Sequence, residues 1–186
     1  METALREGRY TAKYFNVPAS DSIEVRYQMP IYWVKDEEKC KALLDIVYID
    51  HAEKTITPLD VKSDAHGIYR FERTIGKFGY FIQGAFYSDA LLYHKFNLET
   101  DLSSYAINNF EFIVADSNCV ENPIIYRLSN DDLHLGRMGG ENKFGTKIKG
   151  YIELLNDYKW HRDNDEWEYS REVVENQGVI TTSILA

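Results

Sequence analysis

Two short apolar runs separated by a polar turn constrain the fold of this chain more than any other feature. The first run covers residues 43–49 and the second covers residues 56–62, and both are rich in leucine, isoleucine and valine. Residues 50–55 between them are mostly polar, as in the connection of a β-hairpin. We therefore expect two antiparallel strands, with aspartates inside otherwise apolar stretches.

The register of this hairpin would bring two carboxylates and an ammonium together. If Ile49 pairs with Ile56, then Asp45 lies opposite Asp60, and directly opposed Cβ atoms are about 4.5–5.5 Å apart. Side chains alternate along a strand, so Lys62 shares the face of Asp60. The spacing alone thus predicts that these three groups converge.

Such a trio suits a metal-dependent phosphodiesterase site. Two adjacent carboxylates repel each other, and a divalent cation removes that repulsion. Oxygen ligands with water completing the shell favour Mg²⁺ or Mn²⁺, which can activate a water and stabilise charge on a phosphate. Lys62 would orient that water or neutralise the transition state. The ordinary alternative is a surface hairpin carrying a solvated ion cluster, but the apolar neighbours of both aspartates favour a functional role.

Composition narrows the class of protein. The chain has 186 residues, a formal net charge of −9 and 44% hydrophobic residues, enough for a single domain over residues 1–186. The negative charge counts against a broadly basic surface, although a local basic strip can still bind nucleic acid. Cys40 and Cys119 cannot build a four-cysteine metal site, and they fit a reducing compartment. No apolar run approaches the roughly 18 residues of a membrane span, so we expect a cytoplasmic protein without membrane contact.

The remaining patterns predict an α/β (α+β) domain with a mixed central sheet of about five strands flanked by helices. Strands are expected at 23–34, 43–49, 56–62, 109–115 and 123–128. Helices are expected at 1–16, from 69 or 74 to about 96, after a Ser129 cap, and at 148–158. Residues 16–22 are expected to form a loop, and residues 136–145 a flexible segment. The first three strands would form a meander, and the middle helix would pack on one face of the sheet.

A polar stripe on the middle helix suggests contact with a phosphate backbone. At 100° per residue, five side chains fall within about 120° of arc. Cations would meet phosphate charge, and glutamine and tyrosine would donate neutral hydrogen bonds. The alternative is a solvent face with half-buried tyrosines. The stripe consists of Arg73, Lys77, Tyr80, Gln83 and Tyr87, and Arg70 in the preceding loop adds weakly to it.

Taken together, these motifs resemble the PD-(D/E)xK nuclease superfamily. Asp45, then Asp60-Val61-Lys62, then a helix with a Gln-x-x-x-Tyr element are similar to the RecB and lambda-exonuclease branch. Residues 78–87 most resemble the RecE (exonuclease VIII) family. The similarity covers most of residues 23–158 and implies a restriction-endonuclease-like core.

The resemblance assigns roles to individual residues. Asp45, Asp60 and the Val61 carbonyl would bind Mg²⁺ or Mn²⁺, and Lys62 would be the catalytic lysine. Glu24 at the start of the first strand would complete a second metal shell. Gln83 and Tyr87, on the expected middle helix, would hold the site or the nucleic-acid strand near the scissile phosphate.

The activity that this resemblance implies is a metal-dependent exonuclease. Such enzymes degrade linear double-stranded DNA from an end, 5′ to 3′, in phage-type or recombination DNA processing. Several assemble as homo-oligomeric rings, and a single-strand annealing recombinase is a further expected partner. An endonuclease on the same fold, and a non-catalytic DNA-binding or scaffold module, are the alternatives. An N-terminal helix with an additional ligand, found in many relatives, has no clear equivalent in residues 1–16.

Overall fold

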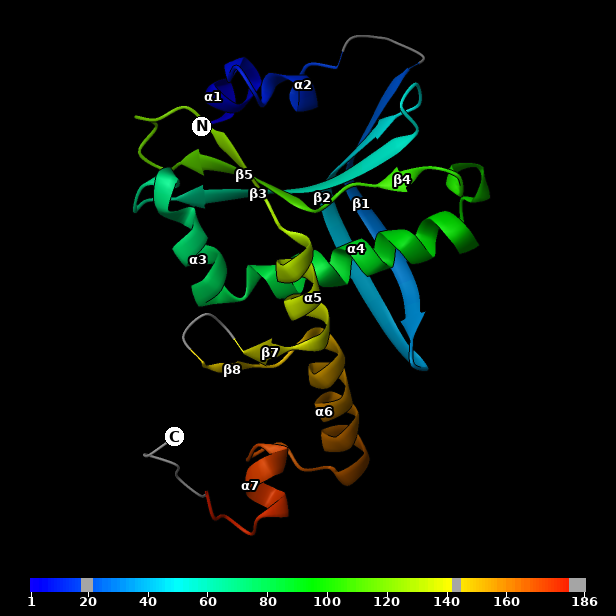
Figure 1. Ribbon diagram of the computed structural model, residues 1–186, viewed down its shortest axis with the longest axis vertical. Coiled ribbons are helices and arrows are strands. Elements are labelled where there is room, and N and C mark those ends of the chain that lie inside the picture. The colour runs from blue at the N-terminus through cyan, green and yellow to red at the C-terminus, as the bar shows by residue number, and fades with distance from the viewer. Residues whose placement is uncertain (18–21, 142–144, 181–186) are drawn as a thin grey trace.

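A mixed sheet of six strands forms the centre of the molecule, with helices on both of its faces (Figure 1). The computed structural model describes residues 1–17, 22–141 and 145–180. The main strands are β1 (Ile23–Lys35), β2 (Glu38–Asp50), β3 (Thr55–Asp64), β4 (Ala106–Ile107), β5 (Glu111–Asp116) and β6 (Ile124–Arg127), and a separate ribbon contains β7 (Gly140–Glu141) and β8 (Lys147–Ile148). The helices are α1 (Glu2–Glu7), α2 (Ala12–Phe15), α3 (Phe71–Phe78), α4 (Tyr80–Asn97), α5 (Asn130–Met138), α6 (Tyr151–Asn164) and α7 (Arg171–Glu175), with 3₁₀ turns η1 (Ile68–Arg70) and η2 (Thr100–Leu102).

The strand order is β1-β2-β3-β5-β6, and β4 also pairs with β3. The first three strands are an antiparallel meander, whereas β5 runs parallel to β3 and antiparallel to β6. The predicted mixed α/β fold is therefore confirmed. The predicted hairpin register is also confirmed, because Ile49 pairs with Ile56 and the pairing extends to Ile46 and Leu59.

The long β1–β2 hairpin changes the direction of its side chains near its middle. The ladder is interrupted where Gln28 faces Asp45, and Gln28 has a left-handed φ of 49°. An unbroken strand would place Val25 and Ile31 on one face. Instead, Val25 packs toward α2 while Ile31 and its neighbours pack into the main core with α4. The expected alternation thus holds on each side of Gln28 but not across it.

The middle helix is two helices, which corrects the expectation of a single one. Gly79 has φ 66° and ends α3 before α4 begins. Glycine adopts this left-handed conformation without the steric penalty of a Cβ atom. The two helices diverge in Figure 1, so the polar stripe drawn on a continuous helix is divided between them.

The main core lies between the sheet and α4, where the sequence placed the middle helix. Phe110, Phe112 and Leu44 are fully buried there, with α5 packed on the far side of α4. The α4–α5 approach is close, since a Cβ on Gly136 would lie 2.3 Å from the Phe81 carbonyl oxygen. A methyl group at this position would push the two helices apart.

The two ends of the chain bring smaller differences. The expected N-terminal helix is two short helices, α1 and α2, which cover the opposite face of the sheet. Residues 18–21 of the expected loop and 142–144 of the expected flexible segment lie outside the described residues, whereas residues 136–138 belong to α5, where Gly136 is buried, which corrects that expectation. The predicted cap of α5 is confirmed, because Ser129 and Asp132 form a capping box. Within the described chain, no helix is long and apolar enough to cross a membrane.

Candidate functional site

Asp45 lies where β2 and β3 stop pairing. The last paired residues are Ile46 and Leu59, and beyond them the Asp45 carboxylate takes the place of a backbone acceptor. Its Oδ2 accepts a hydrogen bond from the Val61 N–H at 2.9 Å. Its Oδ1 accepts one from the Gln28 side-chain amide at 2.8 Å. Asp45 is therefore held beside β3 by one contact from each neighbouring strand.

Asp60 is the buried member of the predicted trio, with only 4% of its surface exposed. The Gln83 amide on α4 donates to Asp60 Oδ1 at 2.8 Å, and Lys62 Nζ lies 2.7 Å from Oδ2. Oδ2 has the Lys62 ammonium as its ion-pair partner and no further donor in the described structure. The Lys62 ammonium also lies 4.6 Å from the centre of the Tyr80 ring.

The environment of Asp60 opposes its ionisation. Burial is the largest influence and raises the pKa of Asp60, and the nearby Asp45 carboxylate raises it further. Lys62 and Gln83 act in the opposite direction without overcoming burial. A second cation beside Asp60 would lower the cost of keeping this carboxylate charged.

These residues fit a divalent cation of the Mg²⁺ type. Two carboxylates are present, and within the described structure one buried carboxylate oxygen has no partner besides the Lys62 ammonium. The N–H and C=O of a strand residue point to the same side, so we expect the Val61 carbonyl to face Asp45 as its N–H does. Mg²⁺ commonly takes one or two carboxylates and keeps several waters. Among the described residues, no three His, Cys, Asp or Glu side chains form a metal-binding group, so a zinc-type cage does not fit.

The structure does not bring Glu24 to this site. Glu24 pairs with Ile49, four positions along β1 from Gln28, which is about 13 Å at 3.3 Å per residue. Its carboxylate contacts Arg26 at 2.6 Å and His51 at 3.3 Å. The Arg26 guanidinium lowers the pKa of Glu24. The predicted role of Glu24 in a second metal shell therefore has no support from its position.

Only some residues of the predicted polar stripe contact the trio of Asp45, Asp60 and Lys62. Tyr80 and Gln83 contact the trio directly. Tyr87 lies one turn beyond Gln83 and packs its ring on Phe110, with centroids 6.1 Å apart. The remaining three residues, Arg70, Arg73 and Lys77, lie on η1 and α3 and touch none of the acids.

Gln28 is a site residue that the sequence analysis missed. Its amide holds Asp45, and its backbone adopts a conformation that is uncommon for any residue other than glycine. In the sequence it was one polar residue of an alternating strand, after Glu24 and Arg26. The only available signal was its position opposite Asp45, which depends on the β1–β2 register.

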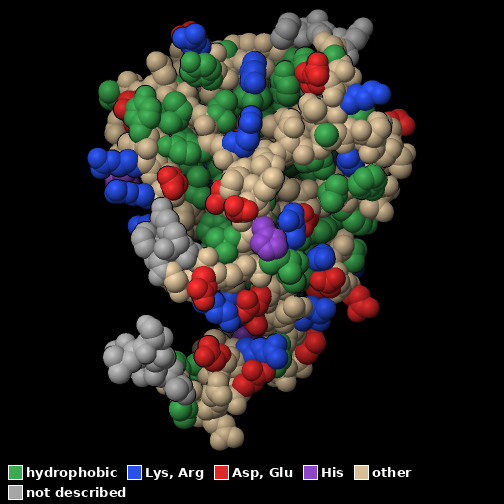
Figure 2. Space-filling model, viewed as in Figure 1, with side chains coloured by type: hydrophobic (Ala, Val, Ile, Leu, Met, Phe, Trp, Pro, Cys, Tyr) green, Lys and Arg blue, Asp and Glu red, His purple; other side chains and the backbone are tan. Residues whose placement is uncertain are grey.

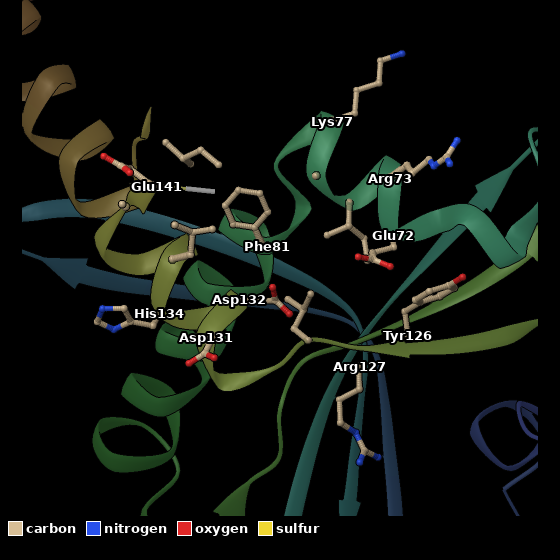
Figure 3. A pocket seen from close by; sticks show the side chains of 17 residues that line it. Glu72, Arg73, Lys77, Phe81, Tyr126, Arg127, Asp131, Asp132, His134 and Glu141 are labelled. Carbon is tan, nitrogen blue, oxygen red and sulfur yellow. The ribbon is translucent and has the colours of Figure 1, made fainter. Parts of the chain in front are cut away.

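A broad groove of about 1160 Å³ lies elsewhere, between α3, β6 and α5. Arg73 and Lys77 line it, but the trio does not. Figure 3 shows both cations projecting away from Glu72 and Asp132, which face the groove. The groove is thus separate from the site at Asp60.

Comparisons with known proteins bear on the fold. No protein-family model matches the chain, and no curated protein matches it. A crystal structure from Eubacterium rectale, described as a "putative exonuclease", is similar with a TM-score of 0.53 and 15% sequence identity. The alignment covers 98% of this chain and 60% of that chain, so this chain spans little more than half of the solved protein. At this identity the similarity shows a common fold, and the chain shares its mixed α/β architecture with that solved protein.

Proposed function

We propose that the protein is a metal-dependent nuclease of the PD-(D/E)xK type that hydrolyses phosphodiester bonds of DNA. The observation that carries the proposal is the buried Asp60 carboxylate, held between Lys62 and Gln83 where β2 and β3 separate. A buried structural aspartate of the same sheet looks different. Asp116 accepts three backbone hydrogen bonds, and these lower its pKa. Asp60 accepts one amide hydrogen bond and pairs with one ammonium, yet burial raises its pKa, as expected for a group that binds a cation.

The side chains of this site have distinct tasks in the proposed reaction. Asp45 and Asp60, with the Val61 carbonyl, would hold Mg²⁺ or Mn²⁺, which would stabilise negative charge on the phosphate and favour ionisation of a water. Lys62 would orient that water and neutralise charge in the transition state. Gln83 keeps Asp60 oriented. The water oxygen adds to phosphorus, one P–O ester bond breaks, and the proton lost by water balances the proton gained by the leaving alkoxide.

Within this class we favour an exonuclease that degrades linear double-stranded DNA 5′ to 3′ in phage-type or recombination processing. The similarity of residues 78–87 to the RecE family and the description of the similar solved structure support this choice. Its partners would be duplex ends, further copies of the chain in a ring and an annealing recombinase. A non-catalytic DNA-binding or scaffold module is the second candidate. The net charge of −9 supports its scaffold form, because a negatively charged protein repels DNA, and Figure 2 shows basic and acidic side chains interspersed on the viewed face.

End-labelled linear duplex DNA and a covalently closed circle would test the proposal with Mg²⁺, Mn²⁺ or EDTA. Metal-dependent loss of the linear DNA alone is the expected result, and the labelled end gives the polarity. Cleavage of the circle would instead indicate an endonuclease. No cleavage of either substrate by folded protein would favour the non-catalytic module.

Metal binding can be tested without catalysis by comparing two aspartates of β2. Mn²⁺ should raise the melting temperature of the parent, because a ligand at 100 times its Kd stabilises by about 2.7 kcal/mol. Asp45→Asn should abolish that rise. Asp50→Asn is the matched control, since Asp50 also lies on β2 and accepts backbone N–H groups, but at the distant turn. An equal loss in both variants would contradict the assigned site.

A further inference from the structure

The outer side of α3 and the turn before it present cations and aromatic rings to solvent. Tyr69 and Phe78 are 69% and 60% exposed. Arg70, Arg73 and Lys77 are also exposed. We call these five residues the α3 face. Its position next to α4, which carries Gln83, places it beside the proposed site.

The cations of the α3 face are not neutralised. The chain has 30 acidic and 21 basic side chains, and many of its arginines form ion pairs. Yet Arg70, Arg73 and Lys77 form no ion pair with any residue that the structure describes. Their spacing of three and four residues aligns them along one side of a helix. Glu72, Asp131, Asp132 and Glu141 line the same groove as Arg73 and Lys77, but the two cations project away from Glu72 and Asp132, so their outer side is suited to an anionic ligand.

The aromatic rings connect this face to the proposed catalytic lysine. Phe78 stacks on Tyr80 with ring centroids 5.8 Å apart and planes 27° from parallel. Tyr80 in turn has the Lys62 ammonium 4.6 Å from its ring centre. The left-handed turn at Gly79 lets the two rings stack although they belong to different helices. A chain bound over Phe78 would therefore lie one ring away from Lys62.

Cations beside exposed rings are suited to single-stranded nucleic acid. Aromatic side chains bind bases through their flat faces, which are available in a single strand but stacked inside a duplex. A duplex needs only phosphate contacts, which would leave Tyr69 and Phe78 without a role. A protein partner with an apolar surface would leave the three cations unpaired.

We propose that the α3 face binds single-stranded DNA, with phosphates on Arg70, Arg73 and Lys77 and bases stacked on Phe78 and Tyr69. This deepens the proposed nuclease function, on which its biological role rests. The strand would be the part of the substrate next to the cleaved bond, after the duplex end has opened. Binding itself requires no metal and no cleavage.

Fluorescence anisotropy with labelled oligo-dT in EDTA would test this proposal directly. Arg73→Ala/Lys77→Ala should weaken binding and reduce the slope of log K against log[salt] by about 1.4, for two phosphate contacts at 0.7 each. Phe78→Ala should weaken binding at least fivefold through lost stacking, with little change in the salt slope. The control is Lys39→Ala/Lys41→Ala on β2, which removes the same charge from two exposed lysines of the distal hairpin.

Three results would overturn the proposal. They are absent binding by the parent, equal losses in the control, and tighter binding of a blunt duplex with the same sensitivity to α3 substitutions. Melting temperatures of the arginine and lysine variants should match the parent because those side chains are exposed, and Phe78→Ala should lower it only slightly through the lost stack on Tyr80. The nuclease proposal is tested separately. If the parent never cleaves DNA but the α3 variants lose oligo-dT binding, the α3 face is supported and the nuclease proposal is rejected. If the parent cleaves DNA but the α3 variants bind oligo-dT as well as the parent does, the nuclease is supported and the α3 face is rejected.

Discussion

Two acidic clusters adjoin the β1–β2 hairpin, one with Glu24 of β1 and Glu99, the other with Asp45 of β2 and Asp60 of β3, and their carboxylates have different partners. In the first, Arg26 contacts Glu24 at 2.6 Å and donates two hydrogen bonds to Glu99, at 2.5 and 2.6 Å. The guanidinium is the main reason that the pKa of Glu99 falls to about 2. In the second, Asp60 has one ammonium and one amide, and burial raises its pKa.

This difference shows that acidic residues alone do not define a metal site. A carboxylate that already has a bidentate arginine gains little from a cation, since its charge is neutralised and its oxygens are occupied. A buried carboxylate with an incomplete set of partners gains much more. We therefore infer that the Arg26 cluster stabilises the fold and that the Asp60 site binds a metal. Substitutions in the two clusters should separate these roles.

Replacing Lys62 should give the largest effect. Lys62→Ala should reduce cleavage at least 10²-fold, the scale seen when one group that stabilises transition-state charge is lost. Mn²⁺ binding should persist, but the melting temperature should fall because buried Asp60 loses its ammonium partner, so cleavage is compared per folded molecule. Lys41→Ala, an exposed strand lysine, is the control and should retain full activity. Comparable cleavage by Lys62→Ala and the parent in single-turnover assays would exclude the proposed mechanism.

Replacing Arg26 should damage stability rather than chemistry. Arg26→Ala leaves two carboxylates without their shared cation and should lower the free energy of unfolding by roughly 2–3 kcal/mol in urea titrations. Cleavage per folded molecule should persist. Arg6→Ala removes an exposed ion pair with Glu2 and should cost less than about 0.5 kcal/mol. Loss of activity without loss of stability in Arg26→Ala would show that the first cluster also takes part in function.

The two clusters should respond to pH with opposite signs. Glu99 has a lowered pKa, so its contribution to stability is present above its usual value of 4.5 and is lost as pH falls toward about 2. This contribution is on the order of 1–3 kcal/mol, and Glu99→Gln should remove it. Asp60 has a raised pKa, so its ionisation costs stability as pH rises above 3.8. Without metal, Asp60→Asn should therefore be more stable than the parent at neutral pH, and this difference should disappear in acid. Urea titrations from pH 3 to 7 would reveal both trends, and equal slopes in parent and variants would contradict them.

Replacing Gln28 should give the smallest change in stability but still affect the metal. Gln28→Gly relieves a left-handed φ and removes the hydrogen bond to Asp45, so the free energy of unfolding should change by less than about 1 kcal/mol. Mn²⁺ affinity, measured by calorimetry, should fall about tenfold, as when a group that orients a ligand is lost. Gln28→Ala should show the same loss of affinity with a lower stability. Unchanged affinity in both would make the Gln28 contact incidental.

The similar solved structure bears on the fold and leaves these functional predictions open. Its TM-score of 0.53 shows the common fold, and measurements of cleavage and metal binding test the roles of Asp45, Asp60 and Lys62. The α3 face adds a test that is independent of catalysis. Together the experiments separate the fold, the metal site and the DNA path.

Local patterns by themselves determined the meander, the hairpin register and the Ser129 cap, because each depends on neighbours that are close in the sequence. The same register predicted that Asp45, Asp60 and Lys62 would converge. Tertiary structure decided the rest. Glu24 lies about 13 Å along β1 from Gln28, and its carboxylate is bound by Arg26, which also binds Glu99, 73 positions after Arg26 in the chain. Gly79 divides the helix, and Gln28 twists the hairpin so that its two halves face different sides, because long-range packing selects backbone conformations that periodicity cannot show.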